Sequence, residues 1–335
     1  MIPERFSALV EAPQICMRVI AQDRGSYCIA KHDLEMRAEL SGRFLYENTT
    51  PESMPAVGDY VSVAISGNSA IIHGLVPRAN LFARRGIYGS HFLQPIAANI
   101  DTMFIVMAAN RDFNVRRLER YLVATAACDL NTVVVLNKID LAEDLDSLRA
   151  EAESIAGYSP VLAISAKSGI GMEELQSFRG VGRSLAFVGS SGVGKSTLIN
   201  SLLQKEILSI GEIRDKDARG RHTTTRRCLI YLDDGTAIVD TPGMREFALA
   251  DAQAGVEQTF ADLSSFAQEC RFRNCTHKTE PGCAVLENLD ESRLESWRKL
   301  EKEAAFEARK ADPRLAAEER KRWKAIHKEA KKRVR

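Results

Sequence analysis

The sequence has no long apolar run, few cysteines and few aromatic residues. No stretch approaches the roughly 18 apolar residues that a membrane-spanning helix needs, and the first residues lack the apolar core of a secretory signal. We therefore expect neither a membrane protein nor a secreted one. The 7 cysteines are odd in number and three of them cluster, which indicates a metal site in a reducing, cytoplasmic compartment rather than a disulfide framework.

Charge is unevenly distributed along the 335 residues, although the formal net charge is only +1. Residues 297–335 hold 15 Lys and Arg against 7 Asp and Glu, so this tail carries +8 and the rest of the chain carries −7. A basic tail on an acidic body indicates either a polyanionic partner or a solvated helix of mixed charge.

The pattern of apolar residues changes twice along the chain and predicts three domains. Residues 1–95 contain short β-branched and aromatic runs between turn residues, which predicts a small barrel or sandwich. Residues 96–250 alternate strand-like and helix-like segments, which is typical of a doubly wound α/β domain. Residues 251–335 form a third, mainly helical domain that ends in the basic tail. The clearest predicted strands are 26–30, 60–65, 70–72, 102–108, 132–136, 161–164, 185–188, 228–232 and 236–239. The predicted helices are 115–127, 146–155, 172–178 and 196–203, with more helix from 291 onward.

A glycine-rich stretch follows the predicted strand at 185–188 and fits the phosphate-binding pattern G-x-x-x-x-G-K-[ST]. The glycines allow backbone N–H groups to close around a phosphate, and the next helix adds the partial positive charge of its N-terminus. Lys195 is expected to reach the β- and γ-phosphates, and the Ser196 hydroxyl is expected to ligate Mg²⁺. The stretch consists of Gly189, Ser190, Ser191, Gly192, Val193, Gly194, Lys195 and Ser196.

An Asn-Lys-x-Asp motif at the end of another predicted strand indicates a guanine site. The Asp140 carboxylate can accept hydrogen bonds from the N1 and N2 donors of guanine, which adenine lacks. Asn137 can bond the edge of the base, and the stem of Lys138 can pack on its face. The motif therefore favours GTP over ATP.

Two more short motifs complete the expected nucleotide site. The segment Ser165, Ala166 and Lys167 can place a backbone N–H against the guanine oxygen. Asp240 is expected to bind Mg²⁺ through water, and the Gly243 N–H is expected to contact the γ-phosphate. The guanine motif precedes the phosphate loop here, whereas ordinary GTPases have the opposite order. The sequence thus predicts a circular permutation, which preserves core contacts when the new ends lie in surface loops.

The C-terminal domain holds Cys270, Cys275, His277 and Cys283 at close spacing. Three thiolates and one imidazole form a closed tetrahedral set for Zn²⁺. Such a set leaves no position for a substrate, so one structural zinc ion is expected. The alternative is a group of buried thiols without a metal.

Together these motifs resemble those of the circularly permuted, ribosome small subunit-dependent GTPase family RsgA. The matching residues are 137–140, 165–167, Gly189 to Thr197, 220–225, 240–243 and the Cys/His set. The resemblance implies a multi-domain α/β protein with an N-terminal OB-fold barrel, a permuted P-loop GTPase domain and a C-terminal zinc domain. It also implies that Thr197 contributes to GTP binding. The implied role is late maturation of the small ribosomal subunit in the cytoplasm, with rRNA binding and subunit-stimulated hydrolysis of GTP to GDP. We expect a monomer.

The sequence leaves two roles open for the residue that would orient the attacking water. Many GTPases place a glutamine directly after Asp-x-x-Gly, and Met244 stands there instead. The resemblance points to His222 as the catalytic residue, and the alternative is that this histidine only orders the switch loop. One of Thr223, Thr224 or Thr225 is expected to close on Mg²⁺.

Two other functions are open on the sequence alone. The chain can be a GTPase of a non-ribosomal pathway, or an RNA-binding protein with a vestigial nucleotide site. The intact Lys195, Ser196, Asp240 and Asp140 argue against a vestigial site. The barrel and the zinc knuckle are common in RNA-binding proteins, which argues against a non-ribosomal pathway by analogy.

Overall fold

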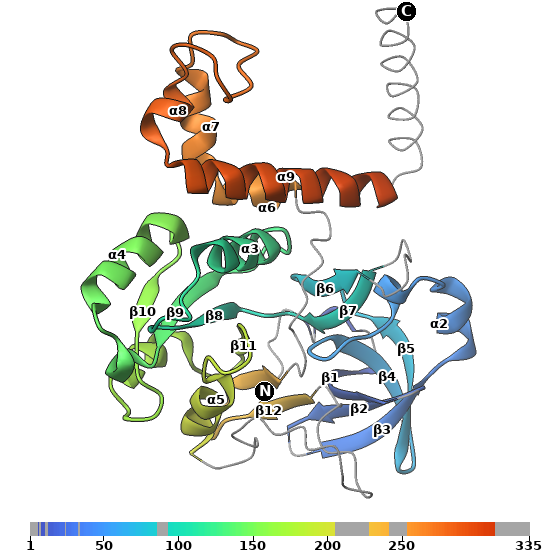
Figure 1. Cartoon of the computed structure of the whole chain (residues 1–335). Helices are drawn as coiled ribbons and strands as arrows, with labels where there is room; N and C mark the ends of the chain where they lie inside the picture. The colour runs from blue at the N-terminus through green and yellow to red at the C-terminus, as the bar shows by residue number, and fades with distance from the viewer. Residues whose placement is uncertain are drawn as a thin grey trace, which may run out of the picture.

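The computed structural model describes residues 6, 8–10, 13–23, 25–32, 34–85, 93–204, 228–240 and 253–311. Their strands form one 11-stranded sheet and a separate two-stranded sheet. Figure 1 shows a barrel and an α/β unit side by side, with a group of helices above the α/β unit. The structure therefore has the predicted multi-domain α/β class, with its parts in the predicted order.

The N-terminal strands close into a five-stranded barrel. They are β1 (Ile15–Asp23), β2 (Ser26–Lys31), β3 (Leu34–Leu40), β4 (Tyr60–Ser66) and β5 (Ser69–Leu75), with α2 (Gly42–Glu47) and η1 (Pro51–Ser53) between β3 and β4. The barrel closes because β1 pairs with both β2 and β4, and β3 pairs with β5. Its interior is filled by alternating apolar side chains such as Met17, Ile29 and Val61, which are fully buried. The strands predicted at 26–30, 60–65 and 70–72 are confirmed.

The α/β unit follows the barrel along the chain. Its elements are β8 (Thr102–Ala108), α3 (Val115–Ala126), β9 (Thr132–Asn137), η2 (Ile139–Leu141), α4 (Leu145–Ala156), β10 (Val161–Ala163), η3 (Met172–Phe178), β11 (Ser184–Val188), α5 (Lys195–Leu203), β12 (Cys228–Tyr231) and β13 (Ala237–Asp240). The strand order is β10-β9-β8-β11-β13-β12, and only β12 runs antiparallel to its neighbour. Every residue of β8 is buried, as expected for a parallel strand covered on both faces.

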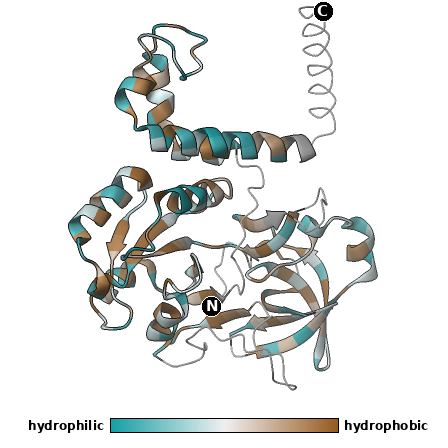
Figure 2. Ribbon diagram, viewed as in Figure 1, coloured by the Kyte–Doolittle hydropathy of each residue, from teal (hydrophilic) through white to brown (hydrophobic). Residues whose placement is uncertain are grey.

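Helices cover both faces of this sheet. One face packs against α3 and α4, and the other packs against α5 and η3 (Figure 1). Figure 2 shows apolar residues concentrated in the strands between these two layers. The strands and helices predicted in this region are confirmed, except that the segment 172–178 is a 3₁₀-helix.

The barrel and the α/β unit share one continuous sheet. The link is the pairing of β12 with β1, at Ala21 and Cys228. The buried Arg18 of β1 also donates a hydrogen bond to the Ser184 hydroxyl of β11, at 2.6 Å. A separate hairpin of β6 (Leu81–Arg85) and β7 (Leu93–Ala98) connects the two regions along the chain. Because β7 spans the expected boundary at 95/96, the exact domain limits stay a prediction.

The C-terminal helices pack on the α/β unit through α3. They are α6 (Gln253–Thr259), α7 (Ala261–Gln268), α8 (Ala284–Asn288) and α9 (Glu291–Ala311). The approach of α6 is close, since a Cβ at Gly255 would lie 2.2 Å from the Val123 carbonyl oxygen. Val123, Val256, Phe260 and Leu300 are buried together in this interface. No helix in the described part of the chain is long and apolar enough to span a bilayer.

Candidate nucleotide site and metal centre

The carboxyl ends of the parallel strands bring the nucleotide motifs to one edge of the sheet. Asn137 ends β9, the segment 165–167 follows β10, the phosphate loop joins β11 to α5, and Asp240 ends β13. The motifs meet although the guanine motif comes first in the chain. His222, Thr223, Thr224, Thr225, Gly243 and Met244 lie outside the described residues, as does the side chain of Asp240.

Two glycines allow the phosphate loop to fit between neighbouring strands. Gly189 has φ +148°, and a Cβ there would lie 2.2 Å from the Val106 carbonyl oxygen. Gly194 has φ +95°, and a Cβ there would lie 2.3 Å from the Asn137 amide nitrogen. Any larger residue at these positions would displace the loop from its neighbours. The loop is therefore held tightly against the ends of β8 and β9.

Lys195 lies across the phosphate loop at the start of α5. Its ammonium group donates hydrogen bonds to the carbonyl oxygens of Gly189, at 2.7 Å, and Ser190, at 2.5 Å. The neighbouring Ser196 and Thr197 are half-buried in the first turn of the helix. The predicted phosphate and Mg²⁺ ligands thus share one helix N-terminus, where the helix dipole favours an anion.

Asn137 joins the phosphate loop to the guanine-side segment. Its amide nitrogen donates to the Val193 carbonyl at 2.9 Å, and its amide oxygen accepts from the Ala166 N–H at 3.0 Å. The side chain is 2% exposed, so water does not compete for these bonds. Sequence analysis placed this side chain at the edge of the base. In the structure the side chain instead connects the phosphate loop to the segment 165–167. A contact between Asn137 and the base stays a prediction.

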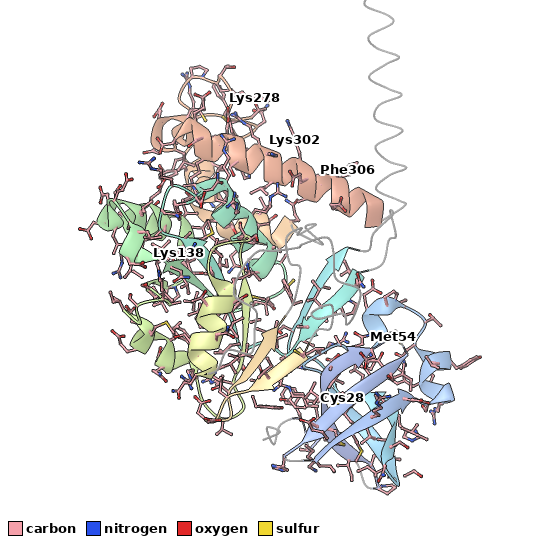
Figure 3. All side chains as sticks on the ribbon, turned by 60° about the horizontal axis from the view of Figure 1, so that its bottom comes forward. Cys28, Met54, Lys138, Lys278, Lys302 and Phe306 are labelled. Atoms are coloured by element: carbon pink, nitrogen blue, oxygen red, sulfur yellow. The ribbon has the colours of Figure 1, made fainter. Side chains whose placement is uncertain are left out.

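The other guanine-motif side chains lie at the surface beside this connection. Lys138 has φ +66° and donates from its ammonium group to the Gly192 carbonyl at 2.6 Å. Its position on the α/β unit is labelled in Figure 3. The exposed Asp140 accepts a hydrogen bond from the buried Ser165 hydroxyl at 2.6 Å. The Ser165 hydroxyl therefore orients the Asp140 carboxylate. Sequence analysis expected only a backbone N–H from the segment 165–167 and did not predict this side-chain role.

The Cys/His set forms a compact cluster in the C-terminal region. The ligand atoms of Cys270, Cys275, His277 and Cys283 all lie within 4.8 Å of one another. The Cys270 and Cys283 sulfurs are 3.8 Å apart, and the His277 Nδ1 lies 3.6 and 3.4 Å from these two sulfurs. Four soft or borderline donors at these separations can surround one metal ion, as predicted.

A carboxylate holds the loop that carries the histidine. Glu280 accepts hydrogen bonds from the backbone N–H groups of Thr276, Lys278 and Thr279, at 2.9 to 3.0 Å. Together with the Thr276 hydroxyl, these donors hold the pKa of Glu280 well below its usual range. Figure 3 labels Lys278 in this loop. The loop is therefore preorganised by its own side chain around His277.

Comparison with known proteins identifies the family. The profile of the RsgA GTPase family matches residues 75–250. The chain belongs to this family. Its relatives include "Small ribosomal subunit biogenesis GTPase RsgA" of Opitutus terrae, which is 42% identical over 309 residues that cover 88% of this chain and 84% of that protein. "Small ribosomal subunit biogenesis GTPase RsgA 2" of Lactiplantibacillus plantarum is 44% identical over 304 residues, which cover 89% and 85% of the two chains.

Solved structures agree with the RsgA assignment. YjeQ from Thermotoga maritima superposes with a TM-score of 0.63 at 28% identity, over 87% of this chain and 98% of that one. YloQ, described as a circularly permuted GTPase, superposes with a TM-score of 0.60 at 22% identity, over 88% and 96% of the two chains. The permuted fold predicted from the order of the motifs is therefore confirmed, and the family match confirms the GTPase class predicted from the motifs themselves.

One feature of this RsgA-family chain was missed by sequence analysis, namely the polar contact between α3 and α9. The fully buried Glu119 of α3 accepts a hydrogen bond from Arg293 at 2.9 Å and another from the Ser296 hydroxyl. Burial raises the pKa of Glu119, while Ser296 and Arg293 act against this rise. The amphipathic pattern of α3 places Glu119 on the buried face of the helix, but it does not identify Arg293 and Ser296 as the partners of Glu119.

Proposed function

We propose that this chain hydrolyses GTP to GDP and phosphate during maturation of the small ribosomal subunit. The observation that supports it most is the Asn137 amide, which connects the phosphate loop to the segment 165–167. This connection holds the phosphate loop and the segment 165–167 at one edge of the sheet, which supports the proposal that a single nucleotide contacts both. The relatives' names refer to small ribosomal subunit biogenesis, and we extend that role to this chain.

The proposed nucleotide contacts divide between the two ends of the site. At the phosphate end, the Lys195 ammonium would release the loop carbonyl oxygens and donate its hydrogen bonds to β- and γ-phosphate oxygens instead. Mg²⁺ would be held by Ser196, by one of Thr223 to Thr225 and, through water, by Asp240. This ion neutralises charge on the transferred phosphoryl group. At the base end, the Asp140 carboxylate accepts hydrogen bonds from the N1 and N2 donors of guanine.

Replacing Asp140 with asparagine should weaken GTP binding. The acceptor pair loses one oxygen, and each hydrogen bond to a charged group is worth roughly 1.5–3 kcal/mol, so the loss should be about tenfold or more. The same variant should gain affinity for xanthosine triphosphate, whose base presents an oxygen where guanine has a donor. Titration with both nucleotides measures the change.

Glu143→Gln is the matched control for this variant. Glu143 is another exposed carboxylate close by in the chain, and it pairs with Arg111 at 2.9 Å. Its replacement should leave the affinity for GTP unchanged. Unchanged GTP affinity in the Asp140→Asn protein would remove Asp140 from the base site.

We further propose that His222 positions the attacking water when the small subunit is bound. A positioned general acid or base contributes typically 10²–10⁴-fold, so His222→Ala should lower stimulated turnover by about 100-fold or more. GTP affinity and subunit binding should stay near the parental values. Equal stimulation of the variant and the parent would assign His222 to ordering the switch loop.

The proposed metal in the Cys/His cluster is one structural Zn²⁺. Zinc–sulfur bonds of about 2.3 Å in a tetrahedron require sulfur atoms about 3.8 Å apart. The Cys270–Cys283 separation of 3.8 Å fits this requirement. All four donors are protein atoms, so the ion would stabilise the fold rather than act on substrate.

The proposed partner is rRNA of the small subunit, contacted by a monomer in the cytoplasm. Lys and Arg neutralise phosphates in such contacts, and the +8 tail at 297–335 supplies several of them. Co-sedimentation with purified small and large subunits, in GDP and in a non-hydrolysable GTP analogue, tests this role. Selective binding to small subunits in the GTP analogue is expected. No binding to either subunit in either state would favour a non-ribosomal GTPase.

A further inference from the structure

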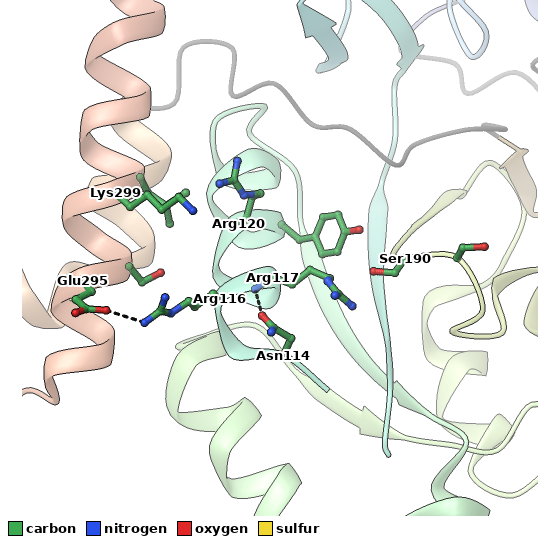
Figure 4. A pocket seen from close by; sticks show the side chains of 11 residues that line it. Asn114, Arg116, Arg117, Arg120, Ser190, Glu295 and Lys299 are labelled. Atoms are coloured by element: carbon green, nitrogen blue, oxygen red, sulfur yellow. Dashed lines mark hydrogen bonds and ion pairs between the residues drawn. The ribbon is translucent and has the colours of Figure 1, made fainter. Parts of the chain in front are cut away.

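A cavity of about 460 Å³ lies between α3, α9 and the phosphate loop (Figure 4). None of the cations in its wall takes part in the nucleotide contacts described above. The cavity joins the GTPase unit to the C-terminal helices directly beside the first serines of the loop. The side chains that matter here are those of Arg116, Arg117, Arg120, Ser190, Ser191 and Lys299.

The walls of this cavity are strongly basic. Four cations face it, and Glu295 is its one acidic lining residue among those the structure describes. Two of the arginines are paired across to α9: Arg116 lies 2.8 Å from Glu295, and Arg120 lies 2.8 Å from Glu303. The excess of positive charge indicates an anion as the natural occupant.

Arg117 differs from its neighbours on the same helix. It is half-buried, and its guanidinium forms no ion pair within the described residues. Figure 4 shows its side chain directed away from α9 and toward the side where Ser190 lies. Its backbone is fixed because its N–H donates to the Asn114 cap at 2.9 Å. Arg117 therefore presents a cation toward the phosphate loop from a rigid helix turn.

The part of the loop that Arg117 faces is the part that meets the terminal phosphates. Lys195, the residue that reaches the β- and γ-phosphates in this motif, already bonds the carbonyl oxygens of Gly189 and Ser190. Ser190 lines the cavity as well. A γ-phosphate held at this end of the loop would therefore lie beside the cavity that Arg117 lines.

We propose that Arg117 binds the γ-phosphate of GTP and supplies, from within the chain, a cation that stabilises the transferred phosphoryl group. The assignment rests on the proposed GTPase function and adds a residue to that site. Guanidinium–phosphate contacts are charge-assisted and often bidentate, which suits a terminal phosphate better than a bridging one. Since Arg116 and Arg120 of the same helix bind α9, docking of the C-terminal helices would also fix the approach of Arg117 to the loop.

Binding of GDP and of a non-hydrolysable GTP analogue to an Arg117→Ala protein tests the proposal. The variant should bind the analogue about tenfold or more weakly and bind GDP within about twofold of the parent, since only the triphosphate reaches Arg117. Arg117→Lys should recover part of the loss. Single-turnover hydrolysis should fall in the alanine variant by more than the loss in binding, because the cation also acts on the transition state.

Arg149→Ala is the matched control, since it removes an arginine of α4 that pairs with Glu153 on the same helix and does not line the cavity. It should leave the ratio of GTP-analogue to GDP affinity unchanged. Parental affinity of Arg117→Ala for both nucleotides would overturn the proposal, as would an equal loss for both. Unchanged nucleotide affinity with weaker binding to small subunits would overturn it in favour of an RNA phosphate in the cavity. Failure of the parent to bind GTP would instead contradict the GTPase function itself.

Discussion

A Cys275→Ser variant should lose its zinc and the ordered structure of residues 261–290, while its nucleotide site stays folded. Closed cysteine and histidine sites gain about 10–16 kcal/mol on binding zinc, most of which appears as folding free energy. The knuckle between α7 and α8 has little regular structure of its own, so it depends on this gain. Hydrogen exchange by mass spectrometry should show loss of protection there, and metal analysis should show loss of zinc.

The nucleotide site should survive because its strands and loops belong to the α/β unit, whereas the Cys/His cluster lies in the C-terminal helices. Val256 of α6 and Phe260, which directly follows that helix, are buried in one cluster with Val123 of α3, and α6 lies outside residues 261–290. GTP binding by Cys275→Ser should therefore match the parent. Cys128→Ser, at a half-buried cysteine outside the cluster, serves as control and should retain zinc. A parent protein without zinc would contradict the account, as would a variant that keeps both zinc and protection, or one that no longer binds nucleotide.

An Arg293→Ala variant should loosen the docking of the C-terminal helices on the GTPase unit. The Arg293 guanidinium pairs with the fully buried Glu119 at 2.9 Å and with Asp262 at 2.7 Å. Removing one partner of a buried pair leaves an uncompensated charge and costs about 3–5 kcal/mol. Hydrogen exchange in peptides from α3, α6 and α9 measures the loss of protection. Arg116→Ala is the control, because its pair with Glu295 is more than half exposed and is worth about 0–1 kcal/mol.

The effect of Arg293→Ala should depend on pH in a defined direction. Burial raises the pKa of Glu119 above that of an unfolded glutamate, and Arg293 is one of the groups that oppose the rise. Without Arg293 the pKa rises further, so the protonated form of Glu119 persists to higher pH. A raised carboxyl pKa contributes stability at pH below the unfolded value, and this contribution is lost as pH rises toward the folded value. The destabilisation should therefore be smaller at pH 5 than at pH 8.

A double variant separates the buried charge from the loss of packing. Glu119→Gln combined with Arg293→Ala removes both partners, and it should recover most of the protection that Arg293→Ala loses. Equal protection loss in the single and the double variants would show that Arg293 acts through Asp262 or by packing on Phe260. Destabilisation that does not change with pH would support the same conclusion.

Sequence reasoning predicted the α/β unit better than the barrel. The strands that pack on both faces, such as β8 and β9, are continuous apolar runs and can be recognised locally. The strand β1 was missed because Cys16, Arg18 and Gln22 interrupt its pattern. Its polar residue Arg18 is nevertheless buried, because it binds Ser184 of the neighbouring unit. Local patterns carry no information on a partner that lies 166 residues away.

The same limit applies to the site. The phosphate loop, the guanine motif and the Cys/His set are each defined by a short spacing, and the structure assembles them as expected. The bridging role of Asn137 and the contact of Glu119 with Arg293 depend on chain segments that are 56 and 174 residues apart. Arg117 carries no motif at all and is recognised only through the cavity that it shares with the phosphate loop. Residues of this kind require the tertiary structure.

Single-turnover GTP hydrolysis by the full chain, alone and with purified small ribosomal subunits, tests the central claim most directly. We expect slow turnover of the free protein, at around 10⁻⁴ to 10⁻² s⁻¹, as in GTPases without an activating partner. Small subunits should raise the rate by about a hundredfold or more, because positioning and charge stabilisation supply most of the catalysis of phosphoryl transfer. Large subunits should leave it unchanged. An equal rate with and without small subunits would contradict the assignment of this chain as a GTPase that acts on the small subunit.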